Sequence, residues 1–215
     1  MSKIVALTFD DGPNTTTTYQ VIEKLEKYGV TASFFLIADK INEESAKAVL
    51  KEKENGYEIA NHSKTHSFMS KLTAEEIKSE IEYTSEKIYE LIGTYPKFFR
   101  PPFINVSQTM VDNIDLPFIC GINGLDWEPE VLAEKRAEMI LGAMDDGMII
   151  LMHDMPGNDE TVKALDIIIP KLLEEGYEFV NISDLFKLKG VTPTVHSGVV
   201  YSNAFQTNVY ENLLK

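Results

Sequence analysis

Two adjacent carboxylates, Asp10 and Asp11, follow an apolar run in the stretch LTFDDGPN, residues 7–14. A turn alone would explain the Asp-Gly and Gly-Pro pairs, because these dipeptides are common turn formers. Neighbouring carboxylates at the end of a buried strand repel each other, however, and a bound cation would remove that conflict. One aspartate could then ligate a metal while the other stays free as a base.

A second candidate group is HSKTH, residues 62–66, which separates His62 and His66 by four positions. On one helical turn, this spacing would present two imidazoles to a common point, as in zinc motifs. A carboxylate as third ligand would leave one coordination position open for water or substrate, as catalytic zinc requires. Two exposed histidines on a loop are the alternative interpretation. Three of the four histidines follow predicted strands, which favours a metal site.

Four further residues could take part in the same chemistry. Arg100 stands between KFF and two prolines, on a stiff turn that could fix a carboxylate, although a surface ion pair would also explain it. His153 follows an apolar run and could be a core histidine. With Asp126 as a partner, it could instead be an acid with a raised pKa. Trp127, the only tryptophan, could belong to the core or wall a pocket.

The elements that must position these residues alternate along the whole chain. Strand-like apolar runs occupy residues 3–9, 31–38, 57–61, 97–100, 117–122, 148–152 and 177–182. Their nearly continuous hydrophobicity is typical of parallel strands that are buried on both faces. Amphipathic segments separate them, which indicates a doubly wound sheet or a (β/α) barrel. No phosphate-binding glycine fingerprint follows the first run, so the barrel is favoured.

Helix ends support this alternation. A helical pattern over residues 16–29 closes on Gly29, and another over 73–93 begins with a capping box, Thr73 to Glu76. In a barrel, functional groups gather at the carboxyl ends of the strands. Five of the seven predicted strands end in ionisable residues, which predicts one functional rim.

Composition limits the class of protein. The 215 residues are 44% hydrophobic and 25% charged, without a linker or repeat, which indicates a single domain. The net charge of −14 argues against nucleic acid and anionic membranes as partners. The lone cysteine, Cys120, permits no intrachain disulfide. The N-terminal residues lack the features of a signal peptide, which leaves a cytoplasmic protein or a mature or excised domain as alternatives.

The segments TFDDGP, HSKTH, RPPF, LDW and LMH, in this order, resemble the five motifs of the polysaccharide deacetylase family, the NodB-homology domain of carbohydrate esterase family 4. The resemblance covers residues 4 to about 188, and FFRPP and KALDIIIP look most like clostridial acetylxylan esterases. It implies a distorted (β/α) barrel of about seven parallel strands over residues 1–190. Residues 191–215 are then a C-terminal extension of unknown role.

The resemblance also implies a metal site and a base. Asp11, His62 and His66 would hold one divalent metal ion, with zinc expected first and cobalt as the alternative. Asp10 would be the catalytic base, and Arg100 would hold it in place.

The remaining motifs imply the other half of the site. His153 would be the general acid, supported by Asp126. The backbone N–H of Phe103 would stabilise the oxyanion, and Trp127 and Leu151 would wall the pocket for the acetyl methyl group. The family often has tyrosine where this chain has Phe103, which leaves the substrate less certain than the reaction.

The expected function is hydrolysis of acetyl groups from an acetylated polysaccharide or oligosaccharide, with the O-acetyl groups of xylan favoured. N-deacetylation of chitin oligosaccharides or peptidoglycan is the alternative, and a non-catalytic carbohydrate-binding domain is a remote one. Glycoside hydrolysis by two carboxylates would use Asp10 and Asp126 but leave the histidine pair without a role. We expect a monomer that acts outside the cell or at its wall, because such polymers lie there.

Overall fold

The computed structural model describes residues 3–210 and 213. Its strands are β1 (Lys3–Gly12), β2 (Ser33–Leu36), β3 (Glu58–Asn61), β4 (Phe118–Ile119), β5 (Ile149–His153), β6 (Tyr177–Phe179) and β7 (Val200–Tyr201). Its α-helices are α1 (Thr17–Tyr28), α2 (Ala46–Glu54), α3 (Ala74–Ile92), α4 (Gln108–Asn113), α5 (Ala133–Gly142), α6 (Asp159–Glu174) and α7 (Ile182–Leu188). The strands alternate with helices as predicted, and every strand pair is parallel.

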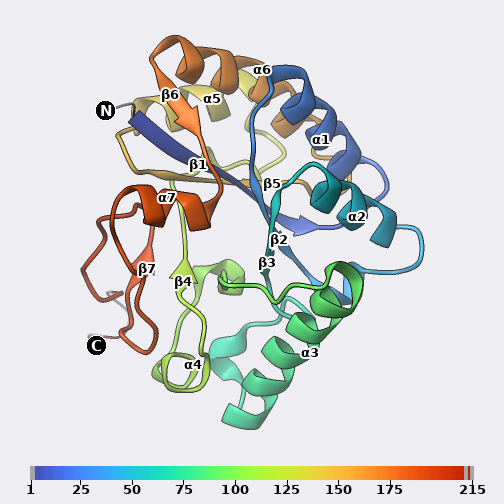
Figure 1. The fold of residues 1–215 in the computed structure, drawn as a ribbon, viewed down its shortest axis with the longest axis vertical. Coiled ribbons are helices and arrows are strands. Elements are labelled where there is room, and N and C mark those ends of the chain that lie inside the picture. The colour runs from blue at the N-terminus through green and yellow to red at the C-terminus, as the bar shows by residue number, and fades with distance from the viewer. Residues whose placement is uncertain (1–2, 211–212, 214–215) are drawn as a thin grey trace.

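The central sheet has the order β3-β2-β1-β5, and β6 pairs with the first residues of β1 (Figure 1). A second, two-stranded sheet joins β4 to β7. Isolated parallel bridges connect the two sheets: Phe99 pairs with Asn61 and with Phe118, and Ile122 pairs with Ile150. The strands therefore close into an irregular ring, and the prediction of an α/β fold built on parallel strands is confirmed.

The strand at residues 97–100 is the exception. This segment makes only the bridges of Phe99 and forms no regular strand. Prolines at positions 96, 101 and 102 flank it, and proline has no N–H to donate to a ladder. The prediction of seven regular strands in these seven runs is therefore wrong at this one. β7 lies instead in the segment after residue 190, where no strand was expected.

The alternation of side chains along β1 decides which of them face the inside of the ring. Val5, Leu7 and Phe9 pack in one core cluster together with residues of α1 and α6. Ile4 and Ala6 belong to a different cluster, inside the ring. Because side chains alternate between the two faces of a strand, Asp10 lies on the inner face with Ile4 and Ala6.

Strand β5 follows the same rule. Ile150 and Met152 pack toward the helices, whereas Ile149 belongs to the inner cluster. Leu151 and His153 share the inner face with Ile149. The sequence period of two thus places Asp10 and His153, which are paired neighbours in the sheet, on the same side.

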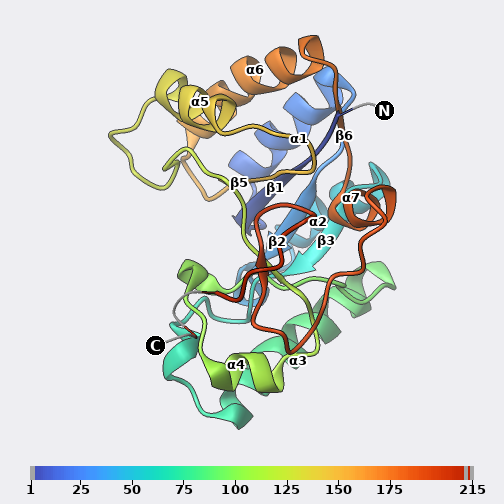
Figure 2. The same cartoon turned by 90° about the vertical axis from the view of Figure 1, so that its left-hand side faces the viewer.

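Helices α1, α5 and α6 cover one side of the ring, and α3 and α4 lie at the opposite end (Figures 1 and 2). Helix α1 ends at Gly29, and α3 begins with the predicted Thr73–Glu76 capping box and ends at Gly93. Helix α6 runs through Pro170 to Glu174. None of the described helices is both long and apolar enough to cross a membrane.

Residues 199–204 are packed into the body of the fold. The carbonyl oxygen of Tyr201 accepts a hydrogen bond from the Cys120 N–H at 2.8 Å, and that of Ser202 accepts one from the Ile149 N–H at 3.0 Å. Val199, Tyr201 and Ala204 are buried in the inner core cluster. This part of the segment therefore supports β4 and β5 directly.

Replacing Tyr201 with alanine should lower the free energy of unfolding by about 3 kcal/mol, because it removes a buried aromatic ring and leaves a cavity. Phe205→Ala, at a ring that is 55% exposed in the same segment, should cost about 1 kcal/mol or less. Urea denaturation measures both, and equal losses would contradict the structural role of Tyr201.

Candidate active site

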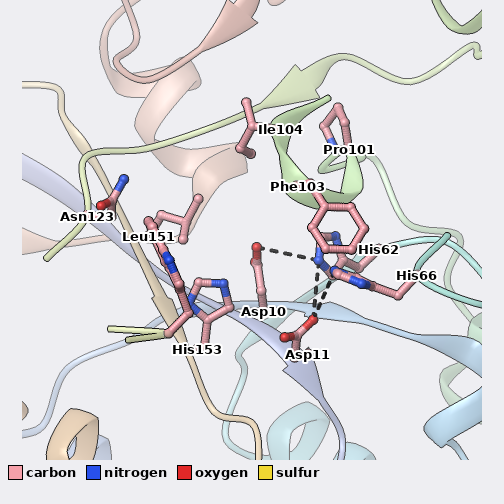
Figure 3. A pocket seen from close by; sticks show the side chains of 11 residues that line it. Asp10, Asp11, His62, His66, Pro101, Phe103, Ile104, Asn123, Leu151 and His153 are labelled. Atoms are coloured by element: carbon pink, nitrogen blue, oxygen red, sulfur yellow. Dashed lines mark ion pairs between the residues drawn. The ribbon is translucent and has the colours of Figure 1, made fainter. Parts of the chain in front are cut away.

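The two adjacent aspartates reach one pocket because β1 is irregular at this point. In the pairing with β2, Asp10 is opposite Phe35 and Gly12 is opposite Leu36, so Asp11 has no partner. This extra residue is a β-bulge, and its φ of 72° is unusual for a residue other than glycine. The bulge takes Asp11 out of the normal alternation, and both carboxylates point into the same cavity (Figure 3).

The residue after the bulge must be glycine. A Cβ atom on Gly12 would lie 2.7 Å from a carboxylate oxygen of Asp154, which is too close. Asp154 is fully buried, and its backbone N–H donates to the Asp10 carbonyl oxygen at 3.1 Å. Burial raises the pKa of Asp154 to about 7. Asp154 was not predicted to have a role, because an aspartate after His153 has no distinctive spacing.

The structure brings Asp11, His62 and His66 together. The Asp11 Oδ1 atom lies 3.5 Å from His62 Nε2 and 3.4 Å from His66 Nε2, and one ligand atom from each residue lies within 4.8 Å of the others. Asp11 Oδ1 is buried and has no hydrogen-bond partner among the described residues. Two ligands of a tetrahedral ion with bonds of about 2.1 Å lie about 3.4 Å apart. These three residues therefore fit a metal ion.

The protonation states suit the same role. Burial, helped by the nearby His62, lowers the pKa of His66 to about 4, so its ring is neutral near pH 7. Burial alone would raise the pKa of Asp11, but the nearby His62, His153 and His66 outweigh burial and hold that pKa well below its usual range. A neutral imidazole and an ionised carboxylate are the forms that bind metals.

The local structure of HSKTH differs from the helical turn that its spacing suggested. Residues 62–66 form an irregular loop after β3, in which Ser63 and His66 have φ values of 67° and 57°. The Asn61 side chain accepts the Ser63 N–H at 2.8 Å, and the Ser63 hydroxyl accepts the His66 N–H at 3.0 Å. These short-range hydrogen bonds replace the helical ones and still direct both rings to one point.

Glu80 of α3 holds the middle of this loop. Its carboxylate accepts the backbone N–H groups of Lys64 and Thr65 at 2.9 and 2.8 Å, and the Thr65 hydroxyl at 2.9 Å. Glu80 was not predicted as a site residue, because its position in a helix rich in glutamate resembles those of its solvated neighbours.

Asp10 is fixed by Arg100. Arg100 is fully buried, which excludes a surface ion pair, and its guanidinium donates to Asp10 Oδ1 and, at 2.6 Å, to the Cys120 carbonyl oxygen. The other carboxylate oxygen of Asp10 lies 3.7 Å from His62 Nε2. The Arg100 carbonyl oxygen also accepts the Nδ1–H of His62 at 2.8 Å, so the His62 Nε2 lone pair is free toward Asp11.

His153 lies across the cavity from His62 and His66 (Figure 3). Its Nδ1 atom is 2.7 Å from Asp126 Oδ1, and its backbone N–H donates to Asp126 Oδ2 at 2.7 Å. Thr161 donates to the same Oδ2 at 2.8 Å. Burial would lower the pKa of His153, but the hydrogen bond and charge of Asp126 raise it to about 9. The ring is thus positively charged near pH 7.

Arg136 completes the support of His153 and was also missed. It is 2% exposed and donates to Asn158 Oδ1 at 2.6 Å and to Thr161 Oγ1 at 2.8 Å. The Asn158 amide in turn donates to the His153 carbonyl oxygen at 3.0 Å. No local pattern around Arg136 distinguishes it from a surface arginine, since its side-chain partners Asn158 and Thr161 lie 22 and 25 positions away.

A cavity of about 380 Å³ joins these groups. Its lining residues are Asp10, Asp11, His62, His66, Pro101, Phe103, Ile104, Asn123, Trp127, Leu151 and His153. The Trp127 ring contacts His153 with 5.7 Å between ring centres. Phe103, whose N–H was predicted to stabilise an oxyanion, lines the cavity with an unusual backbone φ of 58°. The structure thus brings all the predicted site residues to this cavity or directly behind it.

Glu80→Ala should make the Lys64 and Thr65 amides exchange with solvent about 10-fold faster, because both lose a hydrogen bond to a charged acceptor. Hydrogen exchange followed by NMR measures this. Glu82→Ala, an exposed glutamate on the same helix, is the matched control and should leave both rates unchanged. Equal protection in the two variants would refute the role of Glu80.

A family model described as polysaccharide deacetylase matches residues 1–115. A bifunctional xylanase/deacetylase of Pseudobutyrivibrio xylanivorans is 48% identical over 193 residues, which cover 90% of this chain and 32% of that protein. A peptidoglycan N-acetylglucosamine deacetylase of Listeria monocytogenes is 32% identical over 186 residues, which cover 86% of this chain and 39% of that protein. This chain therefore spans about a third of the length of these relatives.

Two solved structures are similar over their whole length. The Xyl-CE4 domain of a multidomain xylanase from the hindgut metagenome of Trinervitermes trinervoides has a TM-score of 0.93 and 45% identity, covering 96% of this chain and 100% of that one. A family 4 acetyl xylan esterase from Clostridium thermocellum, in complex with a cobalt ion, has a TM-score of 0.90 and 42% identity, covering 94% of this chain and 100% of that one. Together with the geometry of the site, these similarities show that the chain belongs to the polysaccharide deacetylase family.

Proposed function

We propose that this chain is a metal-dependent hydrolase that removes acetyl groups from a polysaccharide, with the O-acetyl groups of xylan as the favoured substrate. One observation carries the proposal. The β-bulge directs the carboxylates of both Asp10 and Asp11 into one cavity, and the positively charged His153 lines the same cavity from the opposite side. Asp11 faces two histidines, whereas Asp10 is bound by an arginine. These surroundings suit Asp11 to bind a metal and Asp10 to act as a base, although the two residues are adjacent in the chain.

Asp11, His62 and His66 would hold the metal, which we propose to be zinc, with cobalt able to replace it. A divalent metal at such a site lowers the pKa of a water molecule and polarises a carbonyl group. The two nitrogens and one oxygen suit zinc and cobalt better than magnesium or calcium, which prefer oxygen ligands. The cobalt ion in the similar esterase structure supports the choice of cobalt as a probe.

Asp10 would accept the proton of the attacking water. Arg100 keeps one of its oxygens occupied, so the proton goes to the oxygen that faces His62. The guanidinium also stabilises the ionised carboxylate in a buried position, where an unpaired charge would be costly.

His153 would donate a proton to the departing sugar oxygen. The charge of Asp126 keeps the ring protonated at neutral pH, which a general acid requires. The Phe103 N–H would stabilise the oxyanion of the tetrahedral intermediate. Leu151 and Trp127 would form the apolar wall against the acetyl methyl group.

The similarities favour xylan among the substrates. The relatives and structures whose names refer to xylan are 42–48% identical to this chain, whereas the Listeria peptidoglycan deacetylase is 32% identical. N-deacetylation of chitin oligosaccharides or peptidoglycan stays the alternative, because the same residues could act on an amide. We further propose that residues 1–190 are the domain proper and that residues 191–215 are a C-terminal extension, of which residues 199–204 pack into the domain. We also propose that the protein is a monomer that acts outside the cell or at its wall.

Acetate release tests the function. The metal-reconstituted protein is offered acetylated xylan, N-acetylated chito-oligosaccharides and peptidoglycan in parallel, with and without chelator. We expect chelator-sensitive release from xylan and about 100-fold less from the other two. Release from peptidoglycan alone would establish the alternative. Release that chelators do not affect, or binding of the sugars without any release, would contradict the proposal.

The pH dependence of turnover gives a further prediction. A group with a pKa of about 9 is protonated below pH 9, so activity that needs protonated His153 should fall as the pH rises toward this value, and at somewhat lower pH when a metal cation is bound nearby. Asp126→Asn removes the charge that raises this pKa. The alkaline limb of the kcat profile should therefore move to lower pH, toward the ordinary histidine value of about 6.5. An unchanged or upward-shifted limb would exclude His153 as the acid.

A further inference from the structure

The two proposed histidine ligands are held in different ways. The His62 ring is fixed by the hydrogen bond from its Nδ1–H to the Arg100 carbonyl oxygen, at 2.8 Å, and is buried. For His66, no hydrogen bond to Nδ1 occurs among the described residues, and 24% of its side chain is exposed. Histidines that bind metals usually have such a partner, which fixes the orientation of the ring. Something else must orient His66.

Two phenylalanines, Phe103 and Phe68, pack in a row beside the His66 ring. The centre of the Phe103 ring lies 4.5 Å from that of His66, with the planes inclined by 63°. Phe68 then stacks on Phe103, with 4.0 Å between ring centres and only 10° between the planes. Edge-to-face and offset-stacked contacts are the favoured aromatic arrangements. The three rings form a continuous row that begins at the proposed ligand.

The backbone around this row is constrained at both ends. Phe103 has a φ of 58°, which is rare for a bulky residue and persists only where surrounding contacts maintain it. Phe68 is followed by Met69, which is 1% exposed and belongs to the core cluster with α3 and α4. Phe68 itself is 47% exposed and Phe103 53%, so burial alone does not explain their stacking.

We propose that Phe68 is a positioning residue for the metal site: it supports Phe103, which holds the His66 imidazole in the orientation that binds the ion. The row of rings does for His66 what the Arg100 carbonyl oxygen does for His62. Phe68 is not among the residues that line the cavity, so its proposed effect on the ion runs through Phe103 and His66. The inference rests on the metal site of the proposed function.

Metal affinity tests this without reference to catalysis. Co²⁺ is titrated into the metal-free protein, its dissociation constant is obtained by competition with a chelator, and its visible absorption spectrum reports the coordination geometry. In Phe68→Ala we expect Co²⁺ to bind about 3- to 10-fold more weakly, since one aromatic contact is lost. The visible bands should change, and the bound ion should pass to excess chelator faster.

Three controls separate positioning from general damage. Phe68→Tyr keeps a flat ring and should restore wild-type affinity, whereas Phe68→Leu keeps an apolar side chain without a ring and should behave as Phe68→Ala. Tyr89→Ala removes one ring of the exposed Tyr89–Tyr95 stack, which has 4.3 Å between ring centres and lies at the end of α3, and should have no effect. Unfolding of each metal-free variant by urea reports whether it folds.

Each outcome has one meaning. Wild-type affinity and spectrum in Phe68→Ala or Phe68→Leu would overturn the role of Phe68 and leave the proposed function intact. Equal weakening in Phe68→Ala, Phe68→Tyr and Tyr89→Ala would also overturn it. Failure of the unchanged protein to bind Co²⁺ would overturn the metal-dependent function together with this inference.

Discussion

The arrangement of the site depends on the bulge at Asp11. In a regular strand, adjacent side chains point to opposite faces. One of two neighbouring aspartates would then point away from the cavity, toward the helices outside the ring. The extra residue and its positive φ direct both into the same cavity, at the cost of a strained backbone and a neighbouring glycine that tolerates no side chain. Strain of this kind persists where surrounding contacts over-determine it, and such places are often functional.

The other groups of the site give the two aspartates different surroundings and therefore different roles. Each carboxylate has its own cationic or metal-binding surroundings: Arg100 for Asp10, and the histidine pair for Asp11. The support comes from distant parts of the chain. Glu80 on α3 holds the loop between the histidines, and Arg136 on α5 holds the partners of His153. Buried polar networks of this type are stable only when nearly every member has a partner.

The sequence predicted the parts of this structure that depend on local patterns. The alternation of strands and helices, the ends of α1 and α3, and the gathering of ionisable residues at strand ends are visible in residue types and spacing. The motifs also led to the residues that line the cavity. The resemblance supplied the roles of these residues, which no local pattern could have assigned.

Other features depend on contacts between distant positions and could not be predicted. The segment at 97–100 is held in the ring by the single bridges of Phe99 to Asn61 and Phe118 rather than by a regular ladder. The HSKTH loop takes its shape from Ser63, Asn61 and Glu80 rather than from helical hydrogen bonds. Glu80 and Arg136 look like surface residues in the sequence, since only the folded chain brings their partners to them.

The two adjacent aspartates are proposed to have separate tasks: Asp11 binds the metal and Asp10 acts as the base. A comparison of two variants tests this most directly. Co²⁺ affinity and acetate release from acetylated xylan are measured for Asp10→Asn and Asp11→Asn. Asp10→Asn should bind the ion nearly as well as the unchanged protein and lose at least about 100-fold in turnover, as loss of a general base implies. Asp11→Asn should lose about 100-fold or more in affinity for the ion, because a ligand is removed. Equal loss of metal in both variants, or full turnover in Asp10→Asn, would contradict the account.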